Sequence, residues 1–245
     1  MILRRLREHV RQENWLAVIL ELVVVIVGLF LAFQLDRWYE TQRIKSDQHV
    51  HLGSLAEDFT ENEARLTSAI NRAELKMAAA ITLRGEIRKN SPDLSVTELS
   101  QLVAQTTFLP TYHAVDVTYR NLISGGALVN LPNSELRTEL AEFYAAYELT
   151  KLIQNTHELQ YVTIWQQYAL NSLDYAAVTR VANGGRQYTA LQPYLDPELI
   201  LSAMKTKQFE NVIVIQWESA EDLVNNWSKL LERSMRIQAI ISAQN

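Results

Sequence analysis

Apolar residues form one long run near the start of the chain and a periodic pattern through the rest of it. Between Trp15 and Leu35 the only ionisable residue is Glu21. A helix over this run spans roughly 30 Å, the thickness of the hydrocarbon core of a bilayer. The pattern therefore predicts a transmembrane helix, and with it contact with a lipid bilayer.

Aromatic residues bracket the run. Trp15 lies at its start, and Trp38 and Tyr39 follow its end, where amphipathic rings favour the headgroup zone. A cleaved signal peptide is the alternative, but its apolar core is shorter and a small-x-small cleavage site follows it. Since Phe30-Leu31-Ala32 fits such a site poorly, we expect an uncleaved anchor with these three aromatics as interfacial anchors.

Three regions follow from this division: a basic N-terminal segment at 1–14, a transmembrane helix at 15–38 and a helical-bundle domain outside the membrane at 39–245. Basic residues lie on both sides of the helix. The basic residues before it are Arg4, Arg5, Arg7 and Arg11, and those after it are Arg37, Arg43 and Lys45. The positive-inside rule then favours a cytoplasmic N-terminus and a periplasmic bundle, anchored in the inner membrane of a bacterium.

One face of the anchor carries small residues and the single acid. This transmembrane packing face consists of Ala17, Glu21, Val25, Gly28 and Ala32. Gly28 and Ala32 form a small-xxx-small pair, which lets two helix backbones approach closely, and Glu21 is then placed to hydrogen-bond across the contact. We expect a membrane-protein partner or a homo-oligomer there; an isolated helix that tolerates an acid near the interface is the alternative.

Beyond the anchor the spacing of apolar residues is helical almost throughout. It predicts helices at 54–89, 95–106, 111–124, 134–181, 197–205 and 208–242. We expect the first of them to be continuous with the anchor, since no Pro or Gly intervenes before Gly53. The expected fold is all-α: a single transmembrane helix followed by an antiparallel helical bundle of three long and several short helices.

The first long helix shows an apparent 11-residue repeat of large apolar residues. These residues are Leu55, Phe59, Leu66, Ile70, Met77 and Ile81. An 11-residue period gives a nearly straight apolar stripe. In the second long helix Tyr144, Tyr147, Tyr161, Trp165 and Tyr168 form an aromatic stripe, which we interpret as core, with a ligand pocket as the alternative.

A turn is predicted after the helix at 111–124, before the helix that begins at residue 134. Ser124 is expected to end a helix, with Gly125 supplying a positive φ. Arg120 and Arg137 flank this turn, and we expect one of them to pair with Glu135 or Glu139 and stabilise it; a small anion site is the alternative.

Composition narrows the class of function. The chain has 245 residues, no cysteine, and only 7 glycines and 5 prolines, which suits an all-helical protein without disulfides or thiol chemistry. Residues 36–245 carry a net charge of −6, and their sequence has no basic stripe that could bind the phosphates of a nucleic acid. We therefore expect no nucleic-acid partner.

Two segments resemble a family of uncharacterised bacterial single-pass membrane proteins. The first carries the motif residues Glu21, Gly28, Ala32, Gln34, Asp36, Trp38 and Glu40. The second carries Tyr119, Leu122, Ser124, Gly125, Asn133, Leu136, Arg137 and Tyr144. The resemblance covers about 50 residues in all. It implies the single-pass topology and marks Tyr119, Ser124, Gly125 and Arg137 as a structural turn, and it implies no activity.

No pattern typical of catalysis is present. His49 and His51 point to different sides of a helix, and no metal-ligand spacing, phosphate loop or nucleophile elbow occurs, so we expect no metal, no cofactor and no enzymatic activity. The leading hypothesis is a membrane-anchored, non-enzymatic interaction protein, an accessory or scaffold subunit of an inner-membrane complex. The alternative is a periplasmic ligand-sensing bundle that acts through a partner.

Overall fold

The computed structural model describes residues 15–174 and 197–244, apart from the side chains of 15–18, Glu21 and Pro197. The predicted basic segment at 1–14 lies outside the described residues. The chain divides into two compact units, Met1–Gly53 and Ser54–Asn245, and each is described by itself.

All secondary-structure elements of the described residues are helices, so the all-α prediction is confirmed. In chain order they are α2 (Trp15–Ile87), α3 (Val96–Thr106), α4 (Val117–Ser124), the 3₁₀ turn η1 (Leu128–Asn130), α5 (Ser134–Gln160), the π-helix η2 (Tyr161–Gln166), α6 (Gln167–Ser172), α8 (Pro197–Met204) and α9 (Lys207–Ser242). Helix α2 passes from the apolar run to Ile87 without a break, and it continues through Gly53 and Gly85.

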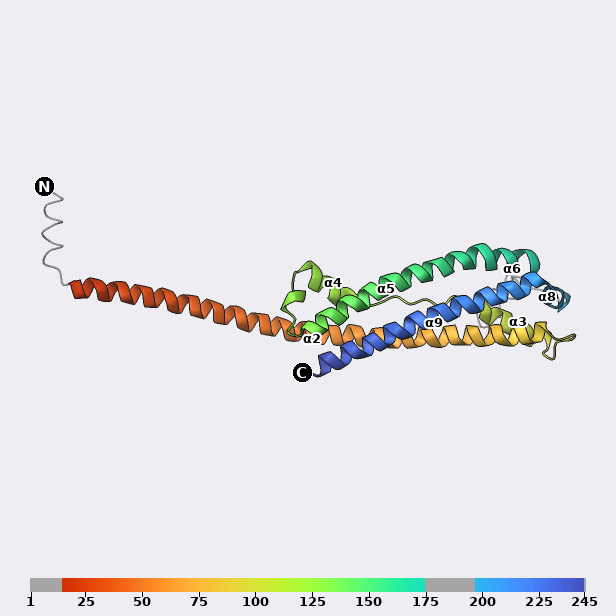
Figure 1. Ribbon diagram of the computed structural model, residues 1–245, viewed down its shortest axis with the longest axis horizontal. Helices are drawn as coiled ribbons and strands as arrows, with labels where there is room; N and C mark the ends of the chain where they lie inside the picture. Colours follow the sequence, from red (N-terminus) through yellow and green to blue (C-terminus); the bar gives the residue numbers. More distant parts are fainter. Residues whose placement is uncertain (1–14, 175–196, 245) are drawn as a thin grey trace, which may run out of the picture. The chain divides into compact units, whose positions relative to one another are not determined.

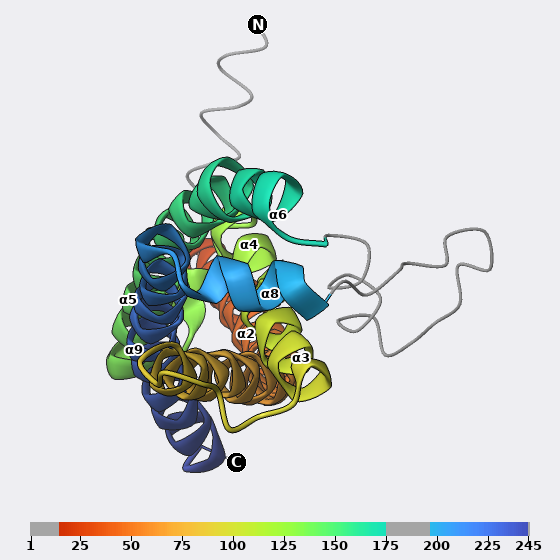
Figure 2. The same ribbon diagram turned by 90° about the vertical axis from the view of Figure 1, so that its right-hand side faces the viewer.

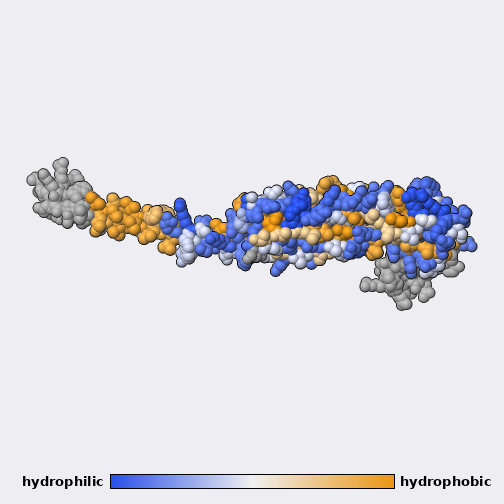
Figure 3. All heavy atoms as spheres, turned by 60° about the horizontal axis from the view of Figure 1, so that its bottom comes forward, coloured by the Kyte–Doolittle hydropathy of each residue, from blue (hydrophilic) through white to orange (hydrophobic). Residues whose placement is uncertain are grey.

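In the first unit the apolar part of α2 is exposed all round. Its large apolar side chains between Leu22 and Leu35 are 47% to 64% exposed, and Figure 3 shows them as orange spheres. Among the described residues this helix alone is long and apolar enough to cross a membrane, and none of its most apolar window is buried within the protein. The structure therefore holds one candidate membrane span.

The second unit is built on three long helices: α2 from Ser54 onward, α5 and α9 (Figures 1 and 2). Near the start of this unit, Phe59 lies edge-on to Phe143 at 4.9 Å, and the Ser234 hydroxyl donates to the Phe59 carbonyl at 3.4 Å. At the other end, Leu83, Trp165 and Phe209 share one core cluster. Helices α2 and α5 therefore run in the same direction, and α9 runs antiparallel to both.

Buried positions on all three helices alternate at spacings of three and four residues. On α2 they are Leu55, Phe59, Asn62, Leu66, Ala69, Ala73, Lys76, Ala80 and Leu83. On α5 they are Leu136, Leu140, Phe143, Tyr147, Thr150, Gln154 and His157. On α9 they are Phe209, Ile213, Gln216, Ala220, Leu223, Trp227, Leu230, Ser234, Ile237 and Ile241. A period of 3.5 residues keeps one seam of each helix facing its neighbours along its whole length.

The 11-residue repeat predicted for α2 is wrong beyond Ile70. Ile81 is 61% exposed, whereas Ala80 and Leu83 are buried. The repeat was drawn from large apolar residues only. The inward positions in this stretch are held by Ala73, Lys76 and Ala80, which such a pattern passes over.

Helix α5 continues through a π-helical turn into α6 and ends at Ser172, short of the predicted residue 181. Leu173 is extended, with φ −128° and ψ 161°, which stops the helix. In the π-helix one extra residue shifts the inward face, so that Trp165 is fully buried. The aromatic stripe forms part of the core, as predicted, with Tyr161 only partly buried.

Two short helices close the end of the bundle where α2 stops. Helix α3 begins with a capping box, in which the Ser95 hydroxyl and the Glu98 carboxylate satisfy each other's backbone amides. It packs with α8 onto the cluster that contains Leu83 and Phe209. The sequence also favours a turn at 183–185 and an N-cap at Asp196, and both lie outside the described residues.

The segment between α3 and α4 returns along α2 without helical structure. A helix was expected from residue 111, but α4 begins only at Val117. Side chains of α2 and α5 bond to residues 107–116 in place of the backbone hydrogen bonds of a helix.

Candidate functional site

Val25, Gly28 and Ala32 of the predicted transmembrane packing face lie on one side of α2, and no other described element covers them. Val25 is 64% exposed, Ala32 is exposed, and a Cβ added at Gly28 meets nothing within 4 Å. The side chains of Ala17 and Glu21 lie outside the described residues. The packing role of this face stays a prediction.

The predicted interfacial anchors Trp38 and Tyr39 are 55% and 65% exposed. Their rings meet edge to face with centroids 5.1 Å apart. The side chain of Trp15 lies outside the described residues. The pair thus presents amphipathic rings three and four residues beyond the apolar run, the arrangement expected of headgroup anchors.

The predicted structural turn is present, but its positive φ belongs to the second glycine. Gly125 caps α4 with φ −84°, and Gly126 has φ +66°. The amide of Ala127 donates to the Leu122 carbonyl at 2.9 Å, which needs the left-handed residue before it. The Ser124 hydroxyl only donates back to Asn121 at 3.3 Å, as a helix-terminal serine does.

Other residues predicted at this turn have structural partners. Tyr119 stacks on Tyr144 with ring centroids 4.0 Å apart and planes 11° apart. Arg137 donates to the carbonyl of Leu131, and Arg120 pairs with Asp116. The expected pairing of these arginines with Glu135 or Glu139 is therefore wrong.

Glu139 instead joins the bundle's own helices. It accepts from Arg233 and Arg236 of α9, both at 3.0 Å, and Arg233 also reaches Glu142 at 2.6 Å. The glutamate side chain is only 12% exposed, so these pairs are partly shielded from water. The network ties the start of α5 to the last turns of α9.

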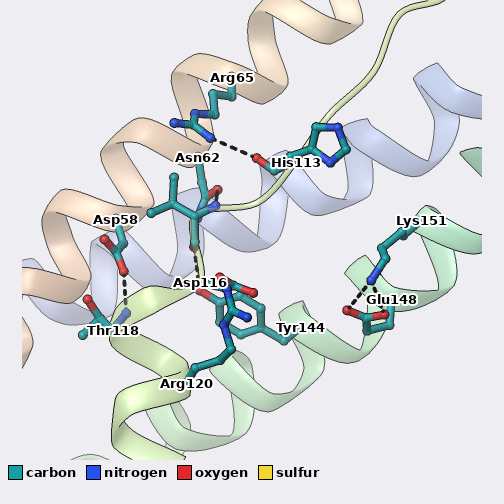
Figure 4. Close-up of polar contacts among 11 residues, drawn as sticks. Asp58, Asn62, Arg65, His113, Asp116, Thr118, Arg120, Tyr144, Glu148 and Lys151 are labelled. Carbon is teal, nitrogen blue, oxygen red and sulfur yellow. Dashed lines mark hydrogen bonds and ion pairs between the residues drawn. The ribbon is translucent and has the colours of Figure 1, made fainter.

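Asn62, a fully buried polar residue on α2, makes three side-chain hydrogen bonds to the returning segment. Its amide nitrogen donates to the Val115 carbonyl at 3.0 Å, and its oxygen accepts from the Val115 amide at 2.8 Å and the Tyr112 hydroxyl at 2.9 Å. Figure 4 shows the side chain directed at the returning segment. We call Asn62, Tyr112 and Val115 the Asn62 junction.

Three neighbours extend the junction to α4 and α5. Asp58 accepts from the Thr118 amide at 3.1 Å, the Tyr144 hydroxyl donates to the Val115 carbonyl at 3.0 Å, and Gln154 accepts from the Tyr112 amide at 3.0 Å. Burial raises the pKa of both Tyr112 and Tyr144 above the usual range, so both stay neutral donors. In this non-helical segment, side chains of α2 and α5 thus replace the backbone hydrogen bonds of a helix.

Lys76 is a second polar residue that occupies an inward position of α2. It is 2% exposed, and burial lowers the pKa of its ammonium group to about 7. A lysine with a pKa near neutrality changes its charge within the physiological range, because desolvation penalises the charged form.

A groove of about 390 Å³ lies beside the junction, between α2 and the returning segment. Arg65, Ser68 and Arg72 line it from α2, and Thr111 and His113 line it from the segment. Arg65 donates to Glu61 at 2.7 Å and to the His113 carbonyl at 3.4 Å, as Figure 4 shows for the latter.

Metal-binding clusters are not assembled in the part of the chain that the structure describes. No group of three His, Asp or Glu side chains there is placed to hold a metal ion. His157 lies 3.5 Å from Asp222 and 3.0 Å from Gln160, in a contact between α5 and α9.

Sequence reasoning missed Asn62, Lys76 and Gln154. All three continue the alternating three- and four-residue spacing of the core, and that spacing was the available signal. A pattern read from apolar residues alone treats such positions as surface.

The chain matches the DUF6090 family, a family of unknown function, over residues 21–172. This range includes the apolar run from Glu21 onward, the Asn62 junction and the Gly126 turn, and it ends at the last residue of α6. No curated protein and no solved structure matches the chain. Because the match spans more than half of its residues, the chain belongs to the DUF6090 family, whose function is unknown.

Proposed function

We propose that this protein is a membrane-anchored, non-enzymatic interaction protein that serves as an accessory or scaffold subunit of a bacterial inner-membrane complex. One observation carries the proposal: the apolar side chains between Leu22 and Leu35 are about half exposed or more, and no described part of the chain covers them. An apolar surface of this extent requires hydrocarbon or an apolar partner.

The packing face of the anchor supports the interaction role. The space above Gly28 is open, and Val25 and Ala32 lie on the same side of the helix. Small residues in this arrangement permit close approach of a second helix, which is the main source of attraction between helices in lipid. We propose a membrane-protein partner or a second copy as the occupant.

Membrane insertion and orientation are tested with single cysteines, because the natural chain has none. Ser91→Cys places an exposed thiol in the bundle, and Glu8→Cys places one before the anchor. With membranes washed in alkaline carbonate, the protein is expected in the pellet. In intact cells an impermeant maleimide that crosses the outer membrane should label Ser91→Cys and spare Glu8→Cys. Extraction by carbonate would refute the anchor, and the reverse labelling would refute the orientation.

The packing role is tested by Gly28→Leu, with Ile26→Phe as the control that adds bulk on the opposite side of the helix. Tagged protein is purified from its native membrane in mild detergent, and its size and associated proteins are determined. We expect Gly28→Leu to lose the complex and Ile26→Phe to keep it. An unchanged complex in Gly28→Leu would contradict the packing face.

A second candidate function is a periplasmic ligand-sensing bundle that acts through a partner. The groove between α2 and residues 107–116 favours it, since its volume of about 390 Å³ suits a small molecule. A thermal-shift screen of the full-length protein with small anions and metabolites tests this candidate. A flat response throughout would count against it.

A further inference from the structure

The groove beside the Asn62 junction contains more positive charge than its surroundings. Its charged lining residues are Glu61, Arg65 and Arg72, with the uncharged polar residues Ser68, Thr111 and His113 between them. The excess of one positive charge occurs in a region, residues 36–245, whose net charge is −6. A local reversal of sign of this kind concentrates anions.

The two arginines differ in what they already bind. Arg65 donates to the Glu61 carboxylate at 2.7 Å, so its charge is compensated. Arg72 donates from Nε to its own helix, at the Ser68 carbonyl 3.3 Å away, and its guanidinium lies 5.6 Å from the ring centre of Phe108. Among the described residues no carboxylate lies within ion-pair distance of Arg72.

The position of Arg72 suits recognition of an oxyanion. A guanidinium over an aromatic ring is held in place while its outer N–H groups stay available, and its fork matches carboxylate and phosphate oxygens. Hydroxyl groups of Ser68 and Thr111 line the same groove and can donate to the same anion.

We propose that this groove binds a small anion that carries a carboxylate or phosphate group, with Arg72 as its charged contact. The inference deepens the ligand-sensing candidate and rests on it, while the membrane anchor is independent of it. Glu61 also lines the groove, and its carboxylate repels a ligand that carries several negative charges near Arg65.

The test uses full-length protein in mild detergent and isothermal titration with acetate, succinate or inorganic phosphate at constant ionic strength. Saturable binding of at least one of these anions is expected. Arg72→Gln should weaken it by about tenfold or more, because a charge-assisted contact is lost. Arg72→Lys keeps the charge and should retain part of the affinity. Glu61→Gln should strengthen binding several-fold.

Arg88→Gln is the matched control. It removes the same charge from α2 at an exposed site, and its partner Glu210 keeps Arg84 and Lys207. Equal weakening in Arg88→Gln and Arg72→Gln, or no saturable binding by the wild type, would overturn the proposal. If a metabolite shifts the unfolding temperature of the wild type and of Arg72→Gln equally, the groove is not the binding site, and the sensing candidate stands without it.

Discussion

At the scale of single residues, one amide determines the path of ten residues. Asn62 satisfies both backbone groups of Val115 and the Tyr112 hydroxyl, at distances of 2.8 to 3.0 Å. A buried partner left unsatisfied costs about 1–3 kcal/mol, so a residue with three such partners contributes far more than its size suggests.

Asn62→Leu is therefore expected to lower the free energy of unfolding by about 3 kcal/mol, despite its apolar gain. Hydrogen exchange at the Val115 amide should accelerate more than exchange elsewhere in the core. Asn71→Leu is the control, since Asn71 is exposed on the same helix. Equal effects of the two substitutions on stability would show that the junction does not hold the segment.

Lys76 makes stability depend on pH. Its pKa is about 7 in the folded chain, whereas an unfolded lysine keeps its proton to about pH 10.4. Between these values the unfolded state binds more protons, so the free energy of unfolding rises with pH from about 7 to about 10. Below pH 7 both states are charged, and burial of the ammonium group costs several kcal/mol at about 1.4 kcal/mol per pKa unit.

We expect Lys76→Met to stabilise the protein most at pH 6, and the gain to shrink as the pH rises towards 10. Chemical denaturation at a series of pH values measures both effects. Lys229→Met is the control, because Lys229 is exposed on α9. If Lys76→Met keeps the wild-type slope between pH 7 and 10, the titration of Lys76 is not its cause.

At the scale of elements, the core follows a seven-residue pattern that polar and small residues obscure. Helix α2 buries Ala73, Lys76, Ala80 and Leu83 in succession, while Ile81 points outward. Packing against two neighbours selects the face, and the side chains at that face need not be the most apolar ones in the helix.

This register predicts opposite outcomes for two neighbouring aliphatic residues. Leu83→Ala should cost about 2–5 kcal/mol, because it leaves a cavity in the cluster with Trp165 and Phe209. Ile81→Ala should change stability by less than about 1 kcal/mol, since Ile81 is 61% exposed. Denaturation midpoints compare the two variants, and a larger loss for Ile81→Ala would restore the 11-residue register.

Much of the helical framework was predictable from the sequence because its signals are local. The capping box at Ser95, the Asn133 cap of α5 and the start of α9 all follow from neighbouring residues. The failures come from long-range contacts. A helix is predicted from residue 111, yet residues 111–116 are not helical, because Asn62, some fifty positions earlier, bonds to Tyr112 and Val115.

The candidate site was less predictable than the fold. The groove is lined by two segments that are far apart in the sequence. Residue spacing therefore could not predict that Arg72 and Thr111 line the same groove. At the Gly125-Gly126 turn the sequence predicts a left-handed residue and the structure decides which glycine adopts it. Arg137 binds a backbone carbonyl, a partner that side-chain charge patterns do not reveal.

At the scale of the whole molecule, the two units differ in where their apolar side chains lie. The second unit buries its own apolar residues and pairs its polar core groups at Asn62 and Tyr112. The first unit exposes a nearly continuous run of apolar side chains. Membrane association should therefore depend on the first unit, and folding of the bundle on the second.

A chain that begins at Ser54 tests this separation, because the second unit starts there. We expect it to remain in the supernatant after membranes are sedimented and to keep the helical circular dichroism and cooperative unfolding of a packed bundle. Val27→Arg in the full chain is the complementary variant, since a charge at the middle of the apolar run costs about 3 kcal/mol on insertion. It should weaken membrane retention without lowering bundle stability. A shortened chain that still sediments with membranes would place the lipid contact on the bundle, and one that does not fold would show that the bundle requires the residues before Ser54.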